Sequence, residues 1–197
     1  MTNPSEGESR PKDSDLLRAY IKGDSRAFEQ LLRRYEKPLF TFVSRMLGNN
    51  QDAEDVFQET LTRVIRNIRS YDEQGKFSKW MFGIAYNLSV DTLRKRKWIK
   101  VHFAEHQSSG ETDRKIEFID REPLPDALLE QKELKEMILQ TLQRLPTEQR
   151  EIFLLRQHSD MTFREIAELV HRPLNTVLSQ MHLALLSIRK FLLTRTK

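Results

Sequence analysis

The sequence predicts an all-α protein made of two small helical domains joined by a flexible linker, the second being a helix-turn-helix domain. Apolar residues recur at three- and four-residue spacing along most of the 197 residues, and no stretch alternates apolar and polar residues as a half-buried strand does. This periodicity fails between His102 and Pro125. After the gap, a short helix, a tight turn and a longer helix follow in helix-turn-helix order.

Composition and the points where the helical periodicity begins and ends predict how the chain is divided. We expect a disordered tail over residues 1–12, a first domain over 13–100, a linker over 101–125 and a second domain over 126–197.

The chain contains no cysteine, which excludes disulfides, thiolate catalysis and cysteine-ligated metal sites. It has no signal-peptide core and no apolar run near the ~20 residues that span a membrane. We therefore expect a cytoplasmic protein without membrane insertion. Its net charge of +4 permits an anionic partner.

The first domain begins with two predicted helices. The first covers Asp15–Ile21 and breaks at Gly23. Asp24 then suits the N-cap of a long helix over Ser25–Leu47. Pro38 lies inside the apolar stripe of this long helix, so we expect a kink or a local break there.

A third helix is predicted over Gln51–Arg69. Its inward face is expected to hold Ala53, Val56, Phe57, Leu61, Val64, Ile65 and Ile68. Three acidic residues share the solvent face at spacings of three and four, namely Asp52, Asp55 and Glu59. An acidic stripe on a rigid helix can meet a basic partner, although a solvated helix face ordinarily has the same composition.

The most informative stretch is Phe77–Trp98, which is predicted to form one amphipathic helix. Its apolar face consists of Phe77, Trp80, Met81, Ile84, Ala85, Leu88 and Leu93. Its C-terminal end carries the basic block Arg94–Lys97. Cations bind phosphates and flat rings stack on exposed bases, so this combination suits a surface for partly unpaired nucleic acid. The alternative is a core helix whose cations interact with the C-terminal helix dipole.

The second domain is predicted to begin with a helix from Asp126 to about Gln143. Pro146 favours the start of the next helix. Thr162 and Glu165 have the spacing of a capping box, in which each side chain binds the backbone N–H of the other residue. A tight turn then leads into the last helix, Pro173–Leu193.

Several motifs occur together and in a fixed order. The first domain carries Gly23-Asp24-x-x-Ala27-Phe28, Asp52-Ala-Glu-Asp55-Val-Phe-Gln58-Glu59 and Phe77-x-x-Trp80-x-x-x-Ile84-Ala85-x-Asn87-x-x-x-Asp91-x-x-Arg94. The second carries Leu145-Pro146-x-x-x-Arg150-Glu151 and Thr162-x-x-Glu165-Ile166-Ala167. With these motifs, the chain resembles the bacterial extracytoplasmic-function sigma factors of the sigma-70 family, from about Asp13 to Leu192.

The resemblance implies an alternative sigma factor, a non-catalytic subunit that binds core RNA polymerase and promoter DNA and directs transcription initiation. It implies no cofactor, and it implies an anti-sigma factor or another regulator as a further partner. The alternative function is a sigma-like protein-interaction module, a mimic or a regulator-binding protein, with weak or no reading of minus-35 DNA.

Three sets of residues take roles from the resemblance. Residues expected to bind core RNA polymerase are Asp52, Asp55, Gln58 and Glu59. Residues expected at the minus-10 element are Lys76, Lys79, Trp80, Asn87, Arg94, Lys95, Arg96 and Lys97. Residues expected at the minus-35 element are Arg172, Asn175, Thr176, Ser179, Gln180 and His182. Two alternatives stay open, since Asn87 can cap or bridge helices and Trp80 can belong to the core.

The last helix departs from the family pattern. Family members commonly carry Lys or Arg after the Thr-Val pair, whereas no permanent cation follows Thr176-Val177 before Arg189 here. A helical wheel turns Leu183 and Leu186 outward and places the buried stripe at Leu174, Val177, Met181, Ala184, Leu185, Ile188 and Leu192. Three explanations are open. In the first, binding to the minus-35 element is weak. In the second, the two leucines form a protein interface, which either the first domain or a second copy of the chain covers. In the third, the chain is a sigma mimic.

One pair of histidines has metal-ligand spacing. His102 and His106 lie four residues apart in the predicted linker, without further ligands nearby. We therefore expect no metal site.

Overall fold

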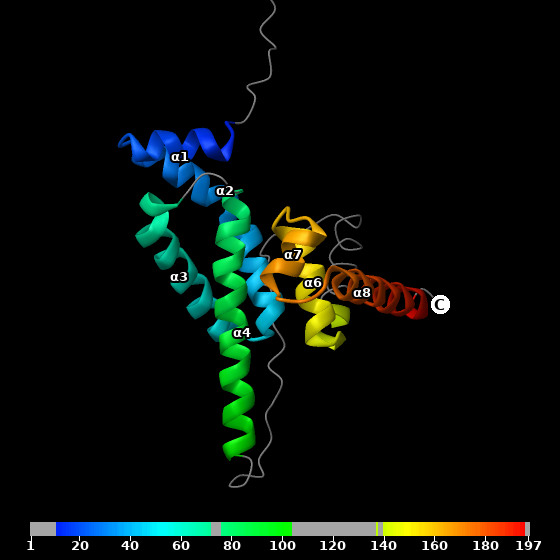
Figure 1. The fold of residues 1–197 in the computed structure, drawn as a ribbon. Coiled ribbons are helices and arrows are strands. Elements are labelled where there is room, and N and C mark those ends of the chain that lie inside the picture. Colours follow the sequence, from blue (N-terminus) through cyan, green and yellow to red (C-terminus); the bar gives the residue numbers. More distant parts are fainter. Residues whose placement is uncertain (1–10, 72–75, 104–136, 138–139, 196–197) are drawn as a thin grey trace, which may run out of the picture.

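Figure 1 shows a chain whose regular elements are all helices, within the residues that the structure describes. The computed structural model describes residues 11–71, 76–103, 137 and 140–195. The helices of the first half are α1 (Asp13–Ile21), α2 (Ser25–Leu47), α3 (Asn50–Asn67), the 3₁₀ helix η1 (Ile68–Ser70) and α4 (Phe77–Phe103). Those of the second half are α6 (Thr147–His158), α7 (Phe163–Leu169) and α8 (Leu174–Arg195). The all-α prediction is confirmed.

The first half is a small bundle in which α2 packs against α1, α3 and α4. Local chemistry fixes the ends of α2, because the Asp24 carboxylate accepts hydrogen bonds from the backbone N–H groups of Arg26 and Ala27 at 3.0 and 3.4 Å. Gly48 ends the helix in the left-handed region at φ 64°, a conformation that favours glycine. The side chains that fill the centre of this bundle include Leu31, Leu39, Phe42, Met46, Met81 and Phe82.

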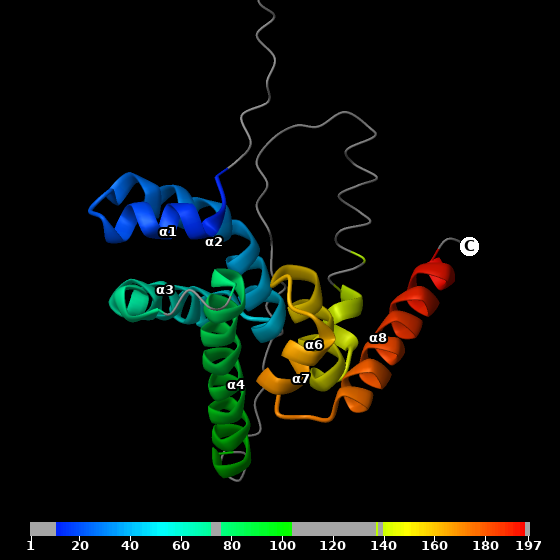
Figure 2. The ribbon, with the colours of Figure 1, turned by 45° about the horizontal axis from the view of Figure 1, so that its top comes forward.

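Pro38 does not break α2. The helix is continuous from Ser25 to Leu47, with Pro38 inside it. Figure 2 shows the second half of α2 turning away from α1, as is typical of a helix with an interior proline. The predicted kink is therefore the correct alternative and the local break is wrong.

The exposure of Ile65 corrects the prediction of which side chains of α3 face inward. The buried residues Ala53, Val56, Thr60, Val64 and Ile68 repeat at spacings of three and four. Ile65 lies one position, about 100°, beyond Val64 and is 49% exposed. Thr60, which the apolar pattern missed, is buried because its hydroxyl donates to the Val56 carbonyl oxygen at 2.7 Å.

The second half contains the helix-turn-helix order predicted from the sequence. Thr162 accepts a hydrogen bond from the Glu165 backbone N–H at 3.3 Å, and Glu165 accepts one from the Thr162 backbone N–H at 2.7 Å, which confirms the capping box. His171, at φ 53°, ends α7 in the left-handed region, and the Arg172 N–H donates to the Ala167 carbonyl oxygen at 3.0 Å.

Parts of the predicted organisation fall outside the described residues. Residues 140–144 are helical, whereas most of the helix predicted over 126–143 lies outside the described part, as do His106 and most of the predicted linker and tail. α4 extends to Phe103, three residues into the segment predicted as linker. The domain boundaries therefore stay a prediction.

The contrast between Ile65 and Ile68 tests the packing of α3. Ile68→Ala should lower the free energy of unfolding by about 2–5 kcal/mol, because the side chain is 1% exposed and its removal leaves a cavity. Ile65→Ala should change it by less than about 1 kcal/mol. Urea denaturation of the two variants measures the difference, and equal losses would contradict this packing.

Candidate functional site

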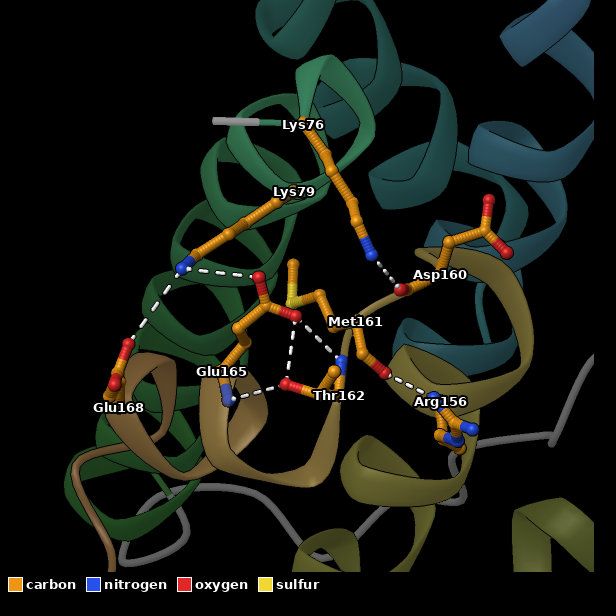
Figure 3. A network of polar contacts seen from close by, with 8 residues as sticks. All are labelled: Lys76, Lys79, Arg156, Asp160, Met161, Thr162, Glu165 and Glu168. Atoms are coloured by element: carbon orange, nitrogen blue, oxygen red, sulfur yellow. Dashed lines mark hydrogen bonds and ion pairs between the residues drawn. The ribbon is translucent and has the colours of Figure 1, made fainter. Parts of the chain in front are cut away.

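Two lysines at the start of α4 contact the second half of the chain (Figure 3). The Lys76 ammonium donates to the Asp160 carbonyl oxygen at 3.2 Å. The Lys79 ammonium lies 3.7 Å from carboxylate oxygens of both Glu165 and Glu168 on α7. The structure brings both lysines to the capped start of α7, and their predicted contact with DNA stays a prediction.

The position of Glu165 follows from the capping box. Its carboxylate accepts hydrogen bonds from the backbone N–H and the hydroxyl of Thr162, at 2.7 and 2.9 Å. The backbone hydrogen bond from Thr162 lowers the pKa of Glu165, with smaller contributions from the hydroxyl and from Lys79 and Lys76. Glu165 therefore stays ionised beside Lys79 at neutral pH.

A buried carboxylate joins α4, α6 and the turn before α8. Glu151 on α6 is 3% exposed. It accepts a hydrogen bond from the Tyr86 hydroxyl at 3.2 Å, and its other oxygen lies 3.1 Å from the Arg172 guanidinium. Burial raises the pKa of Glu151, while Arg172 and the Tyr86 hydrogen bond act in the opposite direction. Burial and the neighbouring Glu151 also raise the pKa of Tyr86.

Sequence reasoning missed Tyr86 and Glu151 as a pair. The available signal was the position of Glu151 on the apolar face of its helix, next to Ile152 and in phase with Leu154 and Leu155. Arg172, predicted to bind DNA, is half-buried and is also 3.7 Å from Glu148. Its guanidinium is therefore largely used inside the protein.

The contact between α2 and α6 buries polar groups. Arg45 on α2 and His158 on α6 are both partly buried, and burial lowers the pKa of Arg45. Burial, followed by the charge of Arg45, lowers the pKa of His158 to about 4. Within the described part of the chain, the buried His158 Nε2, Arg45 Nε and Ser44 Oγ have no hydrogen-bond partner. This interface is consequently less favourable than an apolar one of the same area.

Asp52 and Arg96, assigned to different surfaces by the sequence, form a close ion pair. Arg96 also donates to the Leu47 carbonyl oxygen at 3.0 Å, so it ties α4 to the end of α2 and the start of α3. The expectation that Asp52 is exposed is wrong, because the side chains of Asp52 and Arg96 are only 28% and 31% exposed. Asp55 and Gln58 are exposed, and Glu59 pairs with Arg63 at 2.7 Å.

The remaining polar candidates on α4 face solvent. Asn87, Lys95 and Lys97 are exposed, as is Arg94, whose guanidinium lies 3.5 Å from the Asp91 carboxylate. Trp80 is half-buried, with its ring centroid 4.8 Å from that of Tyr71 and 5.9 Å from that of Phe77. Trp80 thus belongs to the edge of the core as well as to the predicted DNA surface.

The outer face of α8 carries polar residues and leucines together. Asn175, Ser179 and His182 are exposed, whereas Thr176 and Gln180 are half-buried. Leu183 and Leu186 are exposed, and α8 points away from the first half of the chain in Figure 2, so the idea that the first domain covers these leucines is wrong. Leu185, assigned to the buried stripe, is 49% exposed because α6 and α7 cover only the side of α8 that carries Val177 and Ala184.

Comparison with known proteins accounts for both halves of the chain. The model of Sigma-70 region 2 matches residues 31–99, and the model of Sigma-70, region 4 matches residues 135–188. The ECF RNA polymerase sigma factor SigW of Bacillus subtilis is 32% identical over 86% of this chain and 90% of its own length. The chain belongs to the extracytoplasmic-function sigma factors. It is an alternative sigma factor that directs promoter recognition in transcription initiation, and it is not an enzyme.

Other relatives of this sigma factor agree with that assignment. The RNA polymerase sigma-H factor of Pseudomonas aeruginosa is 26% identical over 93% of this chain and 95% of its own. The fold is similar to that of the sigma factor RpoE from Bartonella quintana, solved with the anti-sigma factor NepR, at a TM-score of 0.65, 20% identity and coverage of 85% and 98%. It is also similar to CnrH, solved with the cytosolic domain of CnrY, at a TM-score of 0.59, 22% identity and coverage of 93% and 98%. None of these comparisons favours the interaction-module alternative.

Neither a membrane-spanning helix nor a metal-ligand group occurs among the described residues of this sigma factor. Its described helices are too short or too polar to cross a membrane. Its described histidine and acidic side chains do not gather into a group that could bind a metal ion.

The buried His158 makes the α2–α6 contact sensitive to acid. Its pKa is about 4 in the folded protein against 6.5 in the unfolded chain, so the unfolded chain binds the additional proton. The stabilisation is complete above pH 6.5 and is lost as pH falls toward 4, by up to roughly 3 kcal/mol. The measurement is urea denaturation across this range. His158→Gln is the control and should lose less stability on acidification; parallel curves for both proteins would contradict the role of His158.

Proposed function

We propose that this sigma factor docks on core RNA polymerase through the solvent face of α3 and binds promoter DNA through α4. The polymerase-binding residues on this proposal are Asp55, Gln58 and Glu59, which share one side of α3. Asp52 contributes indirectly, by holding Arg96 and so fixing α3 against α4. This proposal is supported by the exposure of Asp55 and Gln58 on α3, a helix whose opposite face is packed into the core.

The observation that carries the DNA-binding part is the line of exposed polar and cationic side chains on α4. Asn87, Arg94, Lys95 and Lys97 all reach solvent, and an amide can hydrogen-bond a base while the cations neutralise phosphates. Arg96 is excluded from this set because it serves the internal ion pair.

Lys76 and Lys79 bind DNA, on this proposal, only after their contacts with Asp160 and α7 break. Their partners are a backbone carbonyl and two carboxylates, and partly exposed ion pairs at 3.7 Å contribute little free energy. A promoter phosphate can therefore replace Glu165 and Glu168 at modest cost. On this proposal the contact between α4 and α7 competes with the minus-10 DNA.

For the second domain we propose weak reading of the minus-35 element by Asn175, Thr176, Ser179, Gln180 and His182. Arg172 is held by Glu151, and the nearby leucines supply no phosphate contact. Leu183 and Leu186 are proposed to bind an anti-sigma factor or another regulator, since they are exposed and since the similar sigma factor RpoE was solved with the anti-sigma factor NepR. Self-association through the same leucines is the alternative. The sigma factor is proposed to act in the cytoplasm, where its DNA partner lies.

Charge reversal at Asp55 tests the polymerase surface. Asp55→Lys should weaken binding to core RNA polymerase by about tenfold or more, because it replaces an attraction with a repulsion at a docking surface. Glu29→Lys, at an exposed position on α2, makes the same change in net charge away from α3; it is the matched control and should change affinity far less. Titration of labelled core enzyme measures both.

An equal effect of the two reversals would contradict the assignment of the α3 face. Asp52→Lys is not a useful variant for this purpose. It breaks the ion pair with Arg96 and should cost roughly 1–3 kcal/mol of stability.

Charge reversal at Glu168 tests the competition between α7 and DNA. Glu168→Lys removes one carboxylate from Lys79 and adds a like charge, so affinity for a promoter fragment should rise about two- to fivefold. Glu29→Lys makes the same change in net charge at a site remote from α7, where Glu29 pairs with Arg33. Fluorescence anisotropy measures both variants. If both raise affinity equally, net charge alone explains the gain and the competition is wrong.

A further inference from the structure

The last part of α4 carries a stacked aromatic pair that the assigned roles leave unused. In Figure 1 this part of the helix extends beyond the other helices. The rings of Trp98 and His102 have centroids 4.3 Å apart and planes 25° apart. The His102 Nδ1 atom lies 3.0 Å from the Trp98 carbonyl oxygen, within hydrogen-bond distance, which holds the second ring in place. Trp98 is nevertheless 58% exposed. We refer to Trp98 and His102 as the aromatic platform.

The platform continues the proposed DNA-binding face of α4. Asn87, Asp91, Arg94, Trp98 and His102 follow one another at spacings of three and four residues, which places them on one side of the helix. The contact between Arg94 and Asp91 and the stacking of Trp98 on His102 agree with that alignment. Along the axis, Trp98 lies about 16 Å beyond Asn87.

The charges around the platform favour an anionic partner. Arg94, Lys95 and Lys97 are exposed within one turn of Trp98, and Asp91 is the acidic residue of this stretch. The exposed apolar residues Ile99 and Val101 lie on other sides of the helix, interspersed with the cations. A helix that lies on a membrane surface instead separates an apolar face from a cationic one. The arrangement therefore fits a nucleic acid better than a lipid surface.

We propose that the aromatic platform stacks on an unpaired base of single-stranded DNA. The flat, pre-stacked rings offer a surface to any base, while Arg94, Lys95 and Lys97 bind the adjoining phosphates. The platform thereby extends the strand contact of α4 beyond Arg94. This inference rests on the proposed function, in which α4 holds promoter DNA.

The test is binding of the full-length protein to labelled oligothymidine and to a duplex of equal length, by fluorescence anisotropy. Trp98→Ala should weaken single-strand binding by between about fivefold and about one hundredfold, with a smaller effect on the duplex. Trp98→Phe should retain most of the affinity because a flat ring remains. Ile99→Ala removes an exposed apolar side chain from another side of the same turn and should leave both affinities unchanged.

Three results would overturn the inference. The first is an unchanged single-strand affinity of Trp98→Ala, and the second is an equal loss of affinity for both DNA forms, which would limit Trp98 to supporting the cations. The third is binding of anionic phospholipid vesicles that is lost in Trp98→Ala while DNA binding is kept. Promoter transcription with core RNA polymerase separates this inference from the proposed function. If the wild type transcribes and Trp98→Ala binds oligothymidine normally, the platform alone is wrong. If Asn87→Ala and Arg94→Ala both transcribe normally, the proposed role of α4 is wrong, whatever the result for Trp98→Ala.

Discussion

The buried carboxylate of Glu151 is the interaction on which the arrangement of the two halves depends. Glu151 lies on α6, where it accepts a hydrogen bond from Tyr86 of α4 and forms an ion pair with Arg172 in the turn before α8. Three elements are therefore oriented by one side chain that is almost inaccessible to water. A buried charge with a missing partner is strongly unfavourable, so Tyr86 and Arg172 hold their positions as long as Glu151 holds its own. The same contact ties the turn before α8 to α6, since Arg172 follows His171 in that turn.

Around Glu151 the interface is polar and incompletely satisfied. Arg45 and His158 are partly buried at the contact of α2 with α6, and burial disfavours the charged form of each. At the rim, Lys76 and Lys79 contribute partly exposed contacts to α7. Such an interface orders the two halves without fusing them into one core, because each polar group regains hydration when the halves separate. This property suits the proposed function, in which the two halves bind different promoter elements.

Sequence patterns predicted what is local and missed what is assembled from distant residues. The caps at Asp24 and Thr162 were predictable because an acceptor side chain and the N–H groups it binds lie within three residues. The periodicity of apolar residues predicted the helices, but it did not predict which helices pack against one another. It assigned Ile65 and Leu185 to buried faces that no neighbouring helix covers, although each lies only one position from a buried residue. For Asp52 the pattern was misleading, since a carboxylate on a polar stripe gives no sign that Arg96, more than forty residues away, will pair with it. For the Tyr86–Glu151 pair, the apolar phase of Glu151 marked a buried carboxylate, but nothing in the pattern indicated Tyr86, 65 positions away, as its partner.

The Lys79 ammonium, shared between two carboxylates, also changes what ionic strength does to this protein. Added salt screens the attraction between lysine and DNA phosphates, which lowers affinity. The same salt screens the attraction of Lys79 to Glu165 and Glu168, which favours release of the lysine. The two effects oppose each other for any cation that exchanges a carboxylate for a phosphate. On the proposed exchange of Lys79 from α7 to DNA, a plot of DNA affinity against salt is therefore shallower than the number of phosphates contacted would give, and the count obtained from its slope is a lower bound.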